Sequence, residues 1–270
     1  MDKIRRAERV AAMTRILADR PCQLFALSDF SDMFGAAKST VSEDLLTIKQ
    51  SLAKFNLGTL ETVAGAAGGV RFIPYRQGAQ ANSVLSQVAQ RLATANRIIA
   101  GGFLYMSDIL FDSQLVGQLG EIFLTRFAAL EPDCIMTVET KGIPLAMMVA
   151  RAFNKPLVIV RRGSKVTEGS AVSINYVTGS SKRIQTMSLP KRSITPGSKV
   201  LIIDDFMKAG GTAKGLMDLS HEVGGVVVGT GVLIATAEPQ PKLVDDYTAL
   251  LILHKVDEQT KDVVITPVLD

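Results

Sequence analysis

The sequence predicts two domains of different class, a winged helix-turn-helix followed by an α/β domain with a mostly parallel sheet. Three observations predict this fold class. Residues 1–74 contain three helical patterns and then two strand-like runs. From about residue 79, strands alternate with helices, which is typical of a parallel sheet covered on both faces. The length of 270 residues suits one small and one medium-sized domain.

The first domain opens with helical patterns at Ile4–Asp19, Leu27–Phe34 and Ala37–Phe55. The first ends before Pro21, and Ser28 is the predicted N-cap of the second. In the third, apolar residues recur at helical spacing from Val41 onward, which leaves the first turn polar.

Two strand-like runs follow at Thr59–Val63 and Val70–Ile73, joined by the glycine-rich segment Ala64–Gly69. This segment joins two strands and opens no helix, so we interpret it as the tip of a wing and not as a dinucleotide-binding loop. Residues 74–78 are the predicted boundary, which makes residues 1–74 the first domain and residues 79–270 the second.

The second domain has the pattern of an α/β sheet. Helices are predicted before Gly101, over 115–130, from about Pro144, and over 212–223; strands are predicted at 134–138, 157–160, 200–203, 226–234 and 250–253.

Positive charge is concentrated in two places, although the formal net charge is only +4. Residues 1–76 carry 11 Lys/Arg against 8 Asp/Glu, and residues 161–192 carry 7 against 1. Two local basic zones indicate two separate anionic partners. Cys22 and Cys134 match no metal-ligand or disulfide pattern, and no run of apolar residues is long enough to span a bilayer. We therefore expect a cytoplasmic protein with no metal site of its own and no membrane partner.

The predicted third helix has the composition of a DNA recognition helix. Polar side chains that do not belong to its apolar stripe are Lys38, Ser39, Thr40, Ser42 and Lys49. The N-terminal residues of a recognition helix contact base edges in the major groove. Contacts to the DNA backbone are predicted from Arg5, Arg6, Arg9 and Arg71. The alternative is that the serines are helix caps and the charges a solvated face, but capping explains one serine and not the cluster.

A second motif predicts a phosphate site. The apolar run 200–203 leads into Asp204 and Asp205 and then into a loop of small residues that opens a helix. Glycines let backbone N–H groups converge on a phosphate, and the helix N-terminus favours the anion. The two acids suit a ligand with neighbouring hydroxyls, such as a ribose diol, with Mg²⁺ screening the repulsion. The candidate binding residues are Asp204, Asp205, Phe206, Met207, Lys208, Ala209, Gly210, Gly211 and Thr212.

This motif resembles the signature with which type I phosphoribosyltransferases bind phosphoribosyl pyrophosphate (PRPP). The resemblance implies that Asp204 and Asp205 hold the ribose hydroxyls and that 208–212 holds the 5′-phosphate. It implies a pyrophosphate loop at Thr140, Lys141 and Gly142, with a non-proline cis peptide between Thr140 and Lys141. It also implies that the basic stretch 161–183, with Lys165, Gly169 and Lys182, is a flexible hood over the ligand.

The whole chain resembles the purine operon repressors of Gram-positive bacteria. The stretches that carry this resemblance are 37–39, 41–45, 65–70, 165–170 and 204–212. It implies a homodimer that represses purine-synthesis genes by binding double-stranded DNA upstream of them, with PRPP as the inducer and guanosine tetraphosphate as a competing effector. Phe103, Tyr105 and Phe206 are candidates to stack on the base of that nucleotide. Lys208 stands where transferases usually have a small residue or an aspartate, so the resemblance implies binding without catalysis and no required cofactor.

Two other functions fit parts of the pattern. An active purine or xanthine phosphoribosyltransferase with an accessory N-terminal domain would consume PRPP. An RNA-binding attenuator on the same fold is disfavoured, since a recognition helix suits the DNA major groove and the narrow major groove of RNA excludes it.

Overall fold

The computed structural model describes residues 4–65, 68–163, 169–177 and 184–269. The chain divides into two compact units whose boundary in the sequence lies between Arg76 and Gln77. This boundary falls inside the segment 74–78 that was expected to separate the domains. Among the described residues, no helix combines the length and apolar character needed to cross a membrane.

The first unit has the order expected of a winged helix: three helices and then a two-stranded hairpin. Its elements are α1 (Arg6–Asp19), α2 (Leu27–Phe34), α3 (Lys38–Lys54), β1 (Thr59–Val63) and β2 (Gly69–Ile73). The two strands are antiparallel, with Leu60 opposite Phe72. Ala66 and Ala67 of the expected wing tip lie outside the described residues.

One apolar stripe from each helix forms the core of this unit. Met13 of α1, Phe30 of α2 and Val41 of α3 are each fully buried, and the rings of Phe25, Phe30 and Phe34 are stacked in series. The expected start of α2 was wrong in one detail. Its N-cap is Ala26, whose backbone N–H donates to the Asp29 carboxylate at 2.9 Å. Asp29 lies one turn further on and can reach back, so the Ser28 hydroxyl is not needed as a cap.

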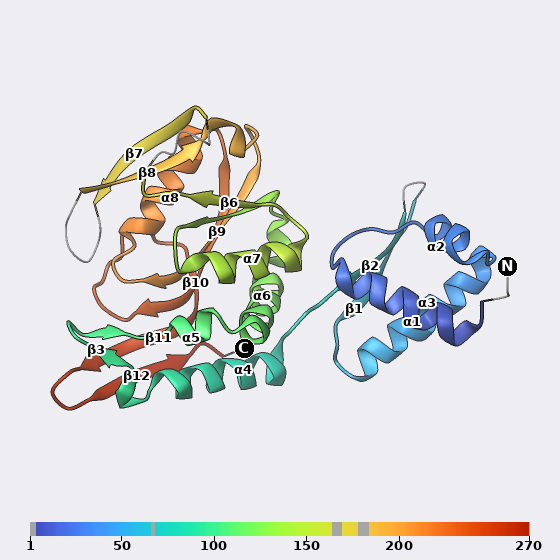
Figure 1. Ribbon diagram of the computed structural model, residues 1–270, viewed down its shortest axis with the longest axis horizontal. Helices are drawn as coiled ribbons and strands as arrows, with labels where there is room; N and C mark the ends of the chain where they lie inside the picture. The colour runs from blue at the N-terminus through green and yellow to red at the C-terminus, as the bar shows by residue number, and fades with distance from the viewer. Residues whose placement is uncertain (1–3, 66–67, 164–168, 178–183, 270) are drawn as a thin grey trace. The chain divides into compact units, whose positions relative to one another are not determined.

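The second unit is an α/β structure around a six-stranded sheet in the order β12-β11-β10-β9-β5-β6 (Figure 1). Strands β6, β5, β9, β10 and β11 are parallel and β12 is antiparallel to β11, so the expected mostly parallel sheet is confirmed. Its helices are α4 (Gly78–Leu92), α5 (Ser107–Leu110), α6 (Ser113–Phe127), α7 (Gly142–Phe153) and α8 (Gly211–Glu222). The strands of the sheet are β5 (Cys134–Val138), β6 (Leu157–Val160), β9 (Lys199–Met207), β10 (Val226–Thr236), β11 (Thr248–Asp257) and β12 (Asp262–Pro267).

Alternate residues of β9 face opposite sides of the sheet, as strand geometry requires. Val200 and Ile202 belong to the apolar cluster that includes Leu216 and Leu219 of α8. Leu201 and Ile203 face α6 instead. A methyl group added at Gly231 of β10 would lie 2.9 Å from the Ile203 side chain and within 2.8 Å of the rings of Phe123 and Phe127. Strand β9 is therefore buried on both faces, and its carboxylates, Asp204 and Asp205, lie near its carboxyl end.

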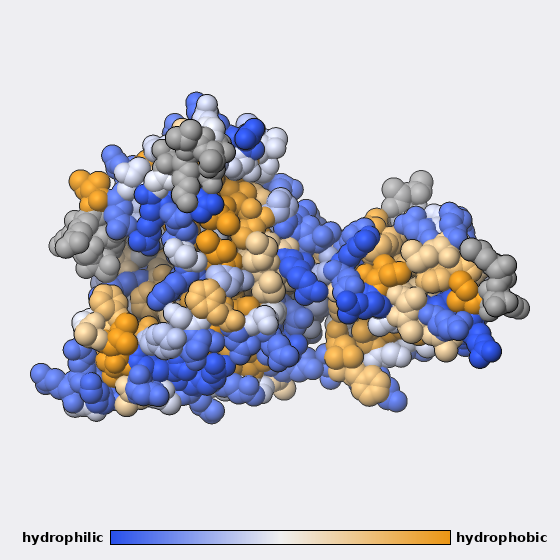
Figure 2. Space-filling model, in the orientation of Figure 1, coloured by the Kyte–Doolittle hydropathy of each residue, from blue (hydrophilic) through white to orange (hydrophobic). Residues whose placement is uncertain are grey.

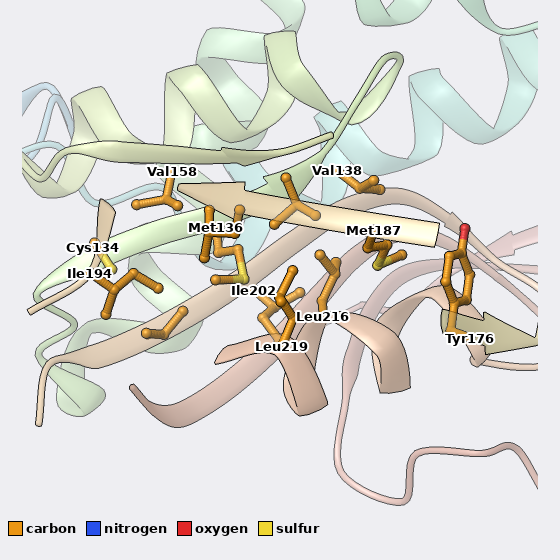
Figure 3. Close-up of a cluster of buried hydrophobic side chains, with 13 residues drawn as sticks. Cys134, Met136, Val138, Val158, Tyr176, Met187, Ile194, Ile202, Leu216 and Leu219 are labelled. Carbon is orange, nitrogen blue, oxygen red and sulfur yellow. The ribbon is translucent and has the colours of Figure 1, made fainter. Parts of the chain in front are cut away.

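Two hairpins lie outside this sheet: β3 (Ile98–Ile99) with β4 (Phe103–Leu104), and β7 (Ala171–Val177) with β8 (Ile184–Pro190). The β7–β8 hairpin lies beside α8 in Figure 1. Strand β7 belongs to the segment 161–183 that was expected to form a hood, and β8 follows that segment. Met187 and Leu189 of β8 complete the cluster under α8, and Figure 3 shows Tyr176 of β7 at one end of that cluster. Neither hairpin was predicted, nor was β12.

Candidate effector and DNA-binding sites

Two strand ends bring the predicted ligand residues of the second unit together. Strands β5 and β9 are parallel neighbours, so their carboxyl ends lie at the same edge of the sheet. Asp204 lies in β9 near this end, and Gly142 opens α7 just after β5. A methyl group added at Gly142 would lie 2.8 Å from the Asp204 carboxylate and 2.7 Å from the Thr137 hydroxyl. The two loops that the sequence analysis assigned to one ligand are thus in contact.

Asp204 and its neighbour differ in environment. The Asp204 side chain is buried, at 6% exposure, whereas Asp205 is half-buried. Burial, and then the adjacent Asp205 carboxylate, raise the pKa of Asp204 well above its ordinary value. The Asp205 backbone N–H donates to the Asp204 carboxylate at 2.9 Å. An acid in this setting gains from hydroxyl donors or a cation, which a ribose diol with Mg²⁺ would supply.

The loop after β9 has the backbone geometry of an anion site. Gly210 adopts the left-handed conformation with φ of 83°, and α8 begins at the next residue. Backbone N–H groups in the first turn of a helix have no intrahelical acceptor and attract negative charge. Lys208 is exposed, while Phe206 and Thr212 are half-buried.

The loop between β5 and α7 exposes Thr140 and Lys141 and buries Gly142. The cis peptide expected between Thr140 and Lys141 lies one bond earlier, between Glu139 and Thr140. Strand β5 ends at Val138 and α7 starts at Gly142, so the spacing alone allowed either bond.

Glu139 connects this loop to the start of the segment 161–183, the expected hood. Its carboxylate pairs with the Arg161 guanidinium at 3.2 Å and accepts from the Arg162 backbone N–H at 2.7 Å. Glu139 was part of the stretch 138–142 that resembles a pyrophosphate loop, but its pairing with Arg161 and Arg162 was not predicted, because these partners lie more than twenty residues away in sequence.

The hood contributes a side chain that sequence reasoning missed. The hydroxyl of Tyr176 donates to the Gln185 side chain at 2.8 Å. Its pKa is raised, chiefly by burial; Thr212 of the phosphate loop partly lowers this pKa, and Arg162 and Asp204 both act on it electrostatically. Lys165, Lys182 and Arg183 of the expected hood lie outside the described residues.

Two of the candidate base-stacking residues, Phe103 and Tyr105, are exposed on the surface of the second unit. Phe103 and Tyr105 are 66% and 45% exposed and belong to the β3–β4 hairpin or the residue after it. Figure 2 shows the apolar surface that this hairpin presents. The backbone N–H of Gly102 donates to Glu258 in the turn after β11. That these rings stack on the base of a bound nucleotide stays a prediction.

In the first unit, α3 presents the predicted polar face. Lys38, Ser39, Ser42 and Lys49 are exposed and Thr40 is half-buried. The N-cap of α3 is Ala37, which has no side-chain cap, so neither serine is needed to start the helix. The wing carries an ion pair between Arg71 and Glu61 at 3.0 Å.

The arginines of α1 differ from expectation. Arg9 was predicted to contact DNA phosphates but is buried, at 8% exposure, with its guanidinium 2.8 Å from the Asp44 carboxylate of α3. A buried carboxylate needs a cation, and Arg9 supplies it. Arg6 contacts the same carboxylate at 3.0 Å and Thr47 at 2.8 Å, although its side chain stays 61% exposed. Arg5 is exposed.

Comparison with known proteins relates both units to described families. Residues 5–74 match the family described as bacterial purine repressor, N-terminal, and residues 114–266 match the phosphoribosyl transferase domain. The chain is 48% identical over 263 residues to the purine biosynthesis transcriptional repressor PurR of Bacillus subtilis, which covers 97% of this chain and 92% of the relative. It is 39% identical over 254 residues to the purine biosynthesis transcriptional activator PurR of Lactococcus lactis, with 94% of each chain covered. The crystal structure of adenine phosphoribosyltransferase from Rhodothermus marinus matches with a TM-score of 0.52 at 24% identity, over 62% of this chain and 97% of that chain. This last match shows the fold alone.

Proposed function

The chain belongs to the PurR family of purine biosynthesis transcriptional regulators, and we propose that it represses purine-synthesis genes by binding DNA, with PRPP as the inducer. The observation that carries the proposal is the pairing of two features in one chain. One is a winged helix whose recognition helix exposes lysine and serine in its first turn. The other is a phosphate loop packed against a buried acid.

In this proposal PRPP binds at the carboxyl end of β9. The 5′-phosphate lies in the 208–212 loop, the ribose hydroxyls donate to Asp204 and Asp205, and the diphosphate lies at Thr140–Gly142. A Mg²⁺ ion bound to the diphosphate would screen the repulsion between the ligand and the carboxylates of Asp204 and Asp205. Guanosine tetraphosphate, which carries diphosphates on a purine nucleoside, competes for the same phosphate positions. The active form is a cytoplasmic homodimer that places two recognition helices on paired half-sites.

Repression is favoured over activation because the relative named a repressor is the more similar of the two, at 48% against 39% identity. In vitro transcription from a purine promoter measures the sign directly. We expect transcript to fall when the protein is added and to return when PRPP is added, whereas an activator would raise it.

An active phosphoribosyltransferase is the second candidate, favoured by the match of residues 114–266 to the transferase domain. Transfer would break the bond between ribose C1 and the pyrophosphate, form a bond to a purine nitrogen, and release pyrophosphate. Against it stands Lys208, an exposed cation in the loop next to the ligand. A cation there strengthens anion binding and supplies no general base.

The test is fluorescence anisotropy of a labelled duplex from a purine-operon control region at fixed salt, with and without PRPP. We expect tight binding that PRPP reverses, with PRPP recovered intact when adenine, guanine, hypoxanthine or xanthine is present. Lys38→Ala should weaken binding and reduce the slope of log affinity against log salt by about one.

Lys54→Ala is the matched control, because Lys54 ends the same helix and lies over the Phe55 ring, at the opposite end from the predicted base contacts. Its salt dependence should equal that of the unchanged protein. Binding that ignores PRPP would remove the inducer from the proposal. Absence of duplex binding together with pyrophosphate release would replace the repressor with an enzyme.

A further inference from the structure

The segment 237–247, between β10 and β11, packs against the phosphate loop, residues 208–212. The Leu243 backbone N–H donates to the Ala209 carbonyl at 2.9 Å. At Gly210 an added methyl group would lie 3.2 Å from the Val244 side chain and 3.3 Å from the Leu243 nitrogen. Val244 is itself buried in a cluster with Met207 and Ala213, which flank the loop. The loop therefore rests on this segment and cannot shift toward it.

Lys242 makes the central contact of this support. Its side chain is 6% exposed, and its ammonium donates to the Lys208 carbonyl at 2.6 Å. It also lies 3.3 Å from the Pro239 carbonyl and 3.5 Å from the Thr236 hydroxyl, which is itself 3.2 Å from the Lys208 carbonyl. All three ammonium hydrogens thus have oxygen acceptors, and two of the acceptors are backbone carbonyls.

A buried lysine bound mainly to carbonyls is costly, because removing the ammonium from water disfavours its charge. Burial lowers the pKa of Lys242, and Glu238 partly opposes that effect. Such a group is retained where its geometry is needed. Here the ammonium holds the carbonyl of Lys208 in place. The N–H group of Ala209 belongs to the same planar peptide group and points to the opposite side from that carbonyl, so fixing the carbonyl also fixes the direction of this N–H.

We propose that Lys242 is a positioning residue for the effector: by holding the Lys208 carbonyl it directs the loop amides of residues 209–211 toward the 5′-phosphate. The inference rests on the proposed PRPP site, and it adds a residue that lies outside both ligand loops. It also makes a specific claim about which part of the ligand depends on Lys242. The affinity for the 5′-phosphate depends on Lys242, whereas the affinity for the diphosphate at Thr140–Gly142 does not.

The experiment measures binding of ribose 5-phosphate, pyrophosphate and PRPP to the full chain by calorimetry. Lys242→Met keeps an unbranched side chain that is one atom shorter and removes its donors. We expect affinity for ribose 5-phosphate and PRPP to fall about tenfold or more, since a buried charged donor is lost. Pyrophosphate affinity should stay within about twofold.

Two lysine variants serve as matched controls. Lys214→Met removes an exposed cation from the first turn of α8, where it pairs with Asp218 at 2.9 Å, and should change all three affinities by less than about threefold. Lys141→Met should show the reverse pattern, with PRPP and pyrophosphate weakened and ribose 5-phosphate unchanged. Thr236→Val removes the hydroxyl beside the same carbonyl and should reproduce the selective loss more weakly, and it decides the matter if Lys242→Met does not fold.

Three outcomes distinguish the role of Lys242 from the existence of the proposed PRPP site. A selective loss of the 5′-phosphate ligands in Lys242→Met supports the inference. Equal losses for pyrophosphate and ribose 5-phosphate, or no loss in a folded variant, would overturn it while leaving the effector site in place. Failure of the unchanged protein to bind ribose 5-phosphate and PRPP would overturn the proposed site and this inference together.

Discussion

Asp204 combines, within one residue, burial and the proximity of a second carboxylate, that of Asp205. Its folded-state pKa lies above its ordinary value, so the folded protein binds a proton there more tightly than the unfolded chain does. By linkage, this carboxyl favours folding most below its unfolded pKa, and that contribution is lost as pH rises through the folded pKa. PRPP binding needs the ionised form as acceptor, so affinity should fall as pH is lowered through the same range.

Asp204→Asn should therefore raise stability while it weakens PRPP binding. The asparagine carbonyl can still accept from the Asp205 N–H, as the carboxylate does, but it removes the buried charge. We expect the thermal midpoint of the second unit to rise by about 2–4 °C and PRPP affinity to fall at least tenfold. The pH dependence of PRPP binding should flatten at the same time. A lower midpoint in calorimetry would contradict this expectation and show that the ionised carboxylate stabilises the fold.

Gly142 is a residue whose absent side chain matters. Gly142→Ala would place a methyl group inside 3 Å of both the Thr137 hydroxyl and the Asp204 carboxylate, so the loop has to move. PRPP and pyrophosphate affinities should fall about tenfold or more, as ligand titration would show. Gly117→Ala on α6 is the control, because an added methyl meets nothing within 4 Å; it should leave binding unchanged and add about 0.5–1 kcal/mol of stability. Equal binding by the Gly142 variant would place the ligand elsewhere.

At the scale of elements, α1 and α3 are joined by a buried ion pair between Arg9 and Asp44 at 2.8 Å. Asp44→Ala leaves Arg9 buried without its carboxylate and should cost about 3–5 kcal/mol of the free energy of unfolding of the first unit. The double variant Arg9→Met, Asp44→Leu should recover most of that loss, since it leaves neither charge unpaired. Urea unfolding of Arg9→Met, Asp44→Leu and the double variant completes the double-mutant cycle. Additive losses in the double variant would mean that the two side chains act independently.

The elements also show how far the sequence alone could be interpreted. Helices with a clear apolar stripe and the fully apolar strands were predicted within a few residues, as was the Asp204–Thr212 loop, because its ligand residues are contiguous. The β7–β8 hairpin was missed although Val172, Ile174 and Tyr176 alternate with polar residues as in a half-buried strand, because the stretch 161–183 was interpreted as a flexible hood. Lys242, Tyr176 and Glu139 act through partners on other elements, and Arg9 looks like any surface arginine until Asp44 is seen beside it. Such contacts join residues that are far apart in sequence. They depend on the topology of the fold, which cannot be predicted from a local sequence pattern.

At the scale of the whole molecule, the proposal joins two ligands that bind to different units of one chain. An inducer can oppose DNA binding only if the DNA-bound protein has a lower affinity for it. The coupling is a single free energy, so DNA must weaken PRPP binding by the same factor by which PRPP weakens DNA binding. This reciprocity holds whatever the structural route between the units.

The last prediction is therefore quantitative and concerns the intact chain. DNA affinity is measured by anisotropy with and without saturating PRPP, and PRPP affinity by calorimetry with and without saturating duplex, in one buffer at one salt concentration. We expect both ratios to agree within about twofold and to lie between about 5 and 150, the usual range of allosteric coupling. Asp204→Asn should bind DNA as the unchanged protein does and should not respond to PRPP at concentrations that release the unchanged protein. If the two ratios disagree, one of the ligands binds at a second place or changes the oligomeric state, and a simple inducer mechanism fails.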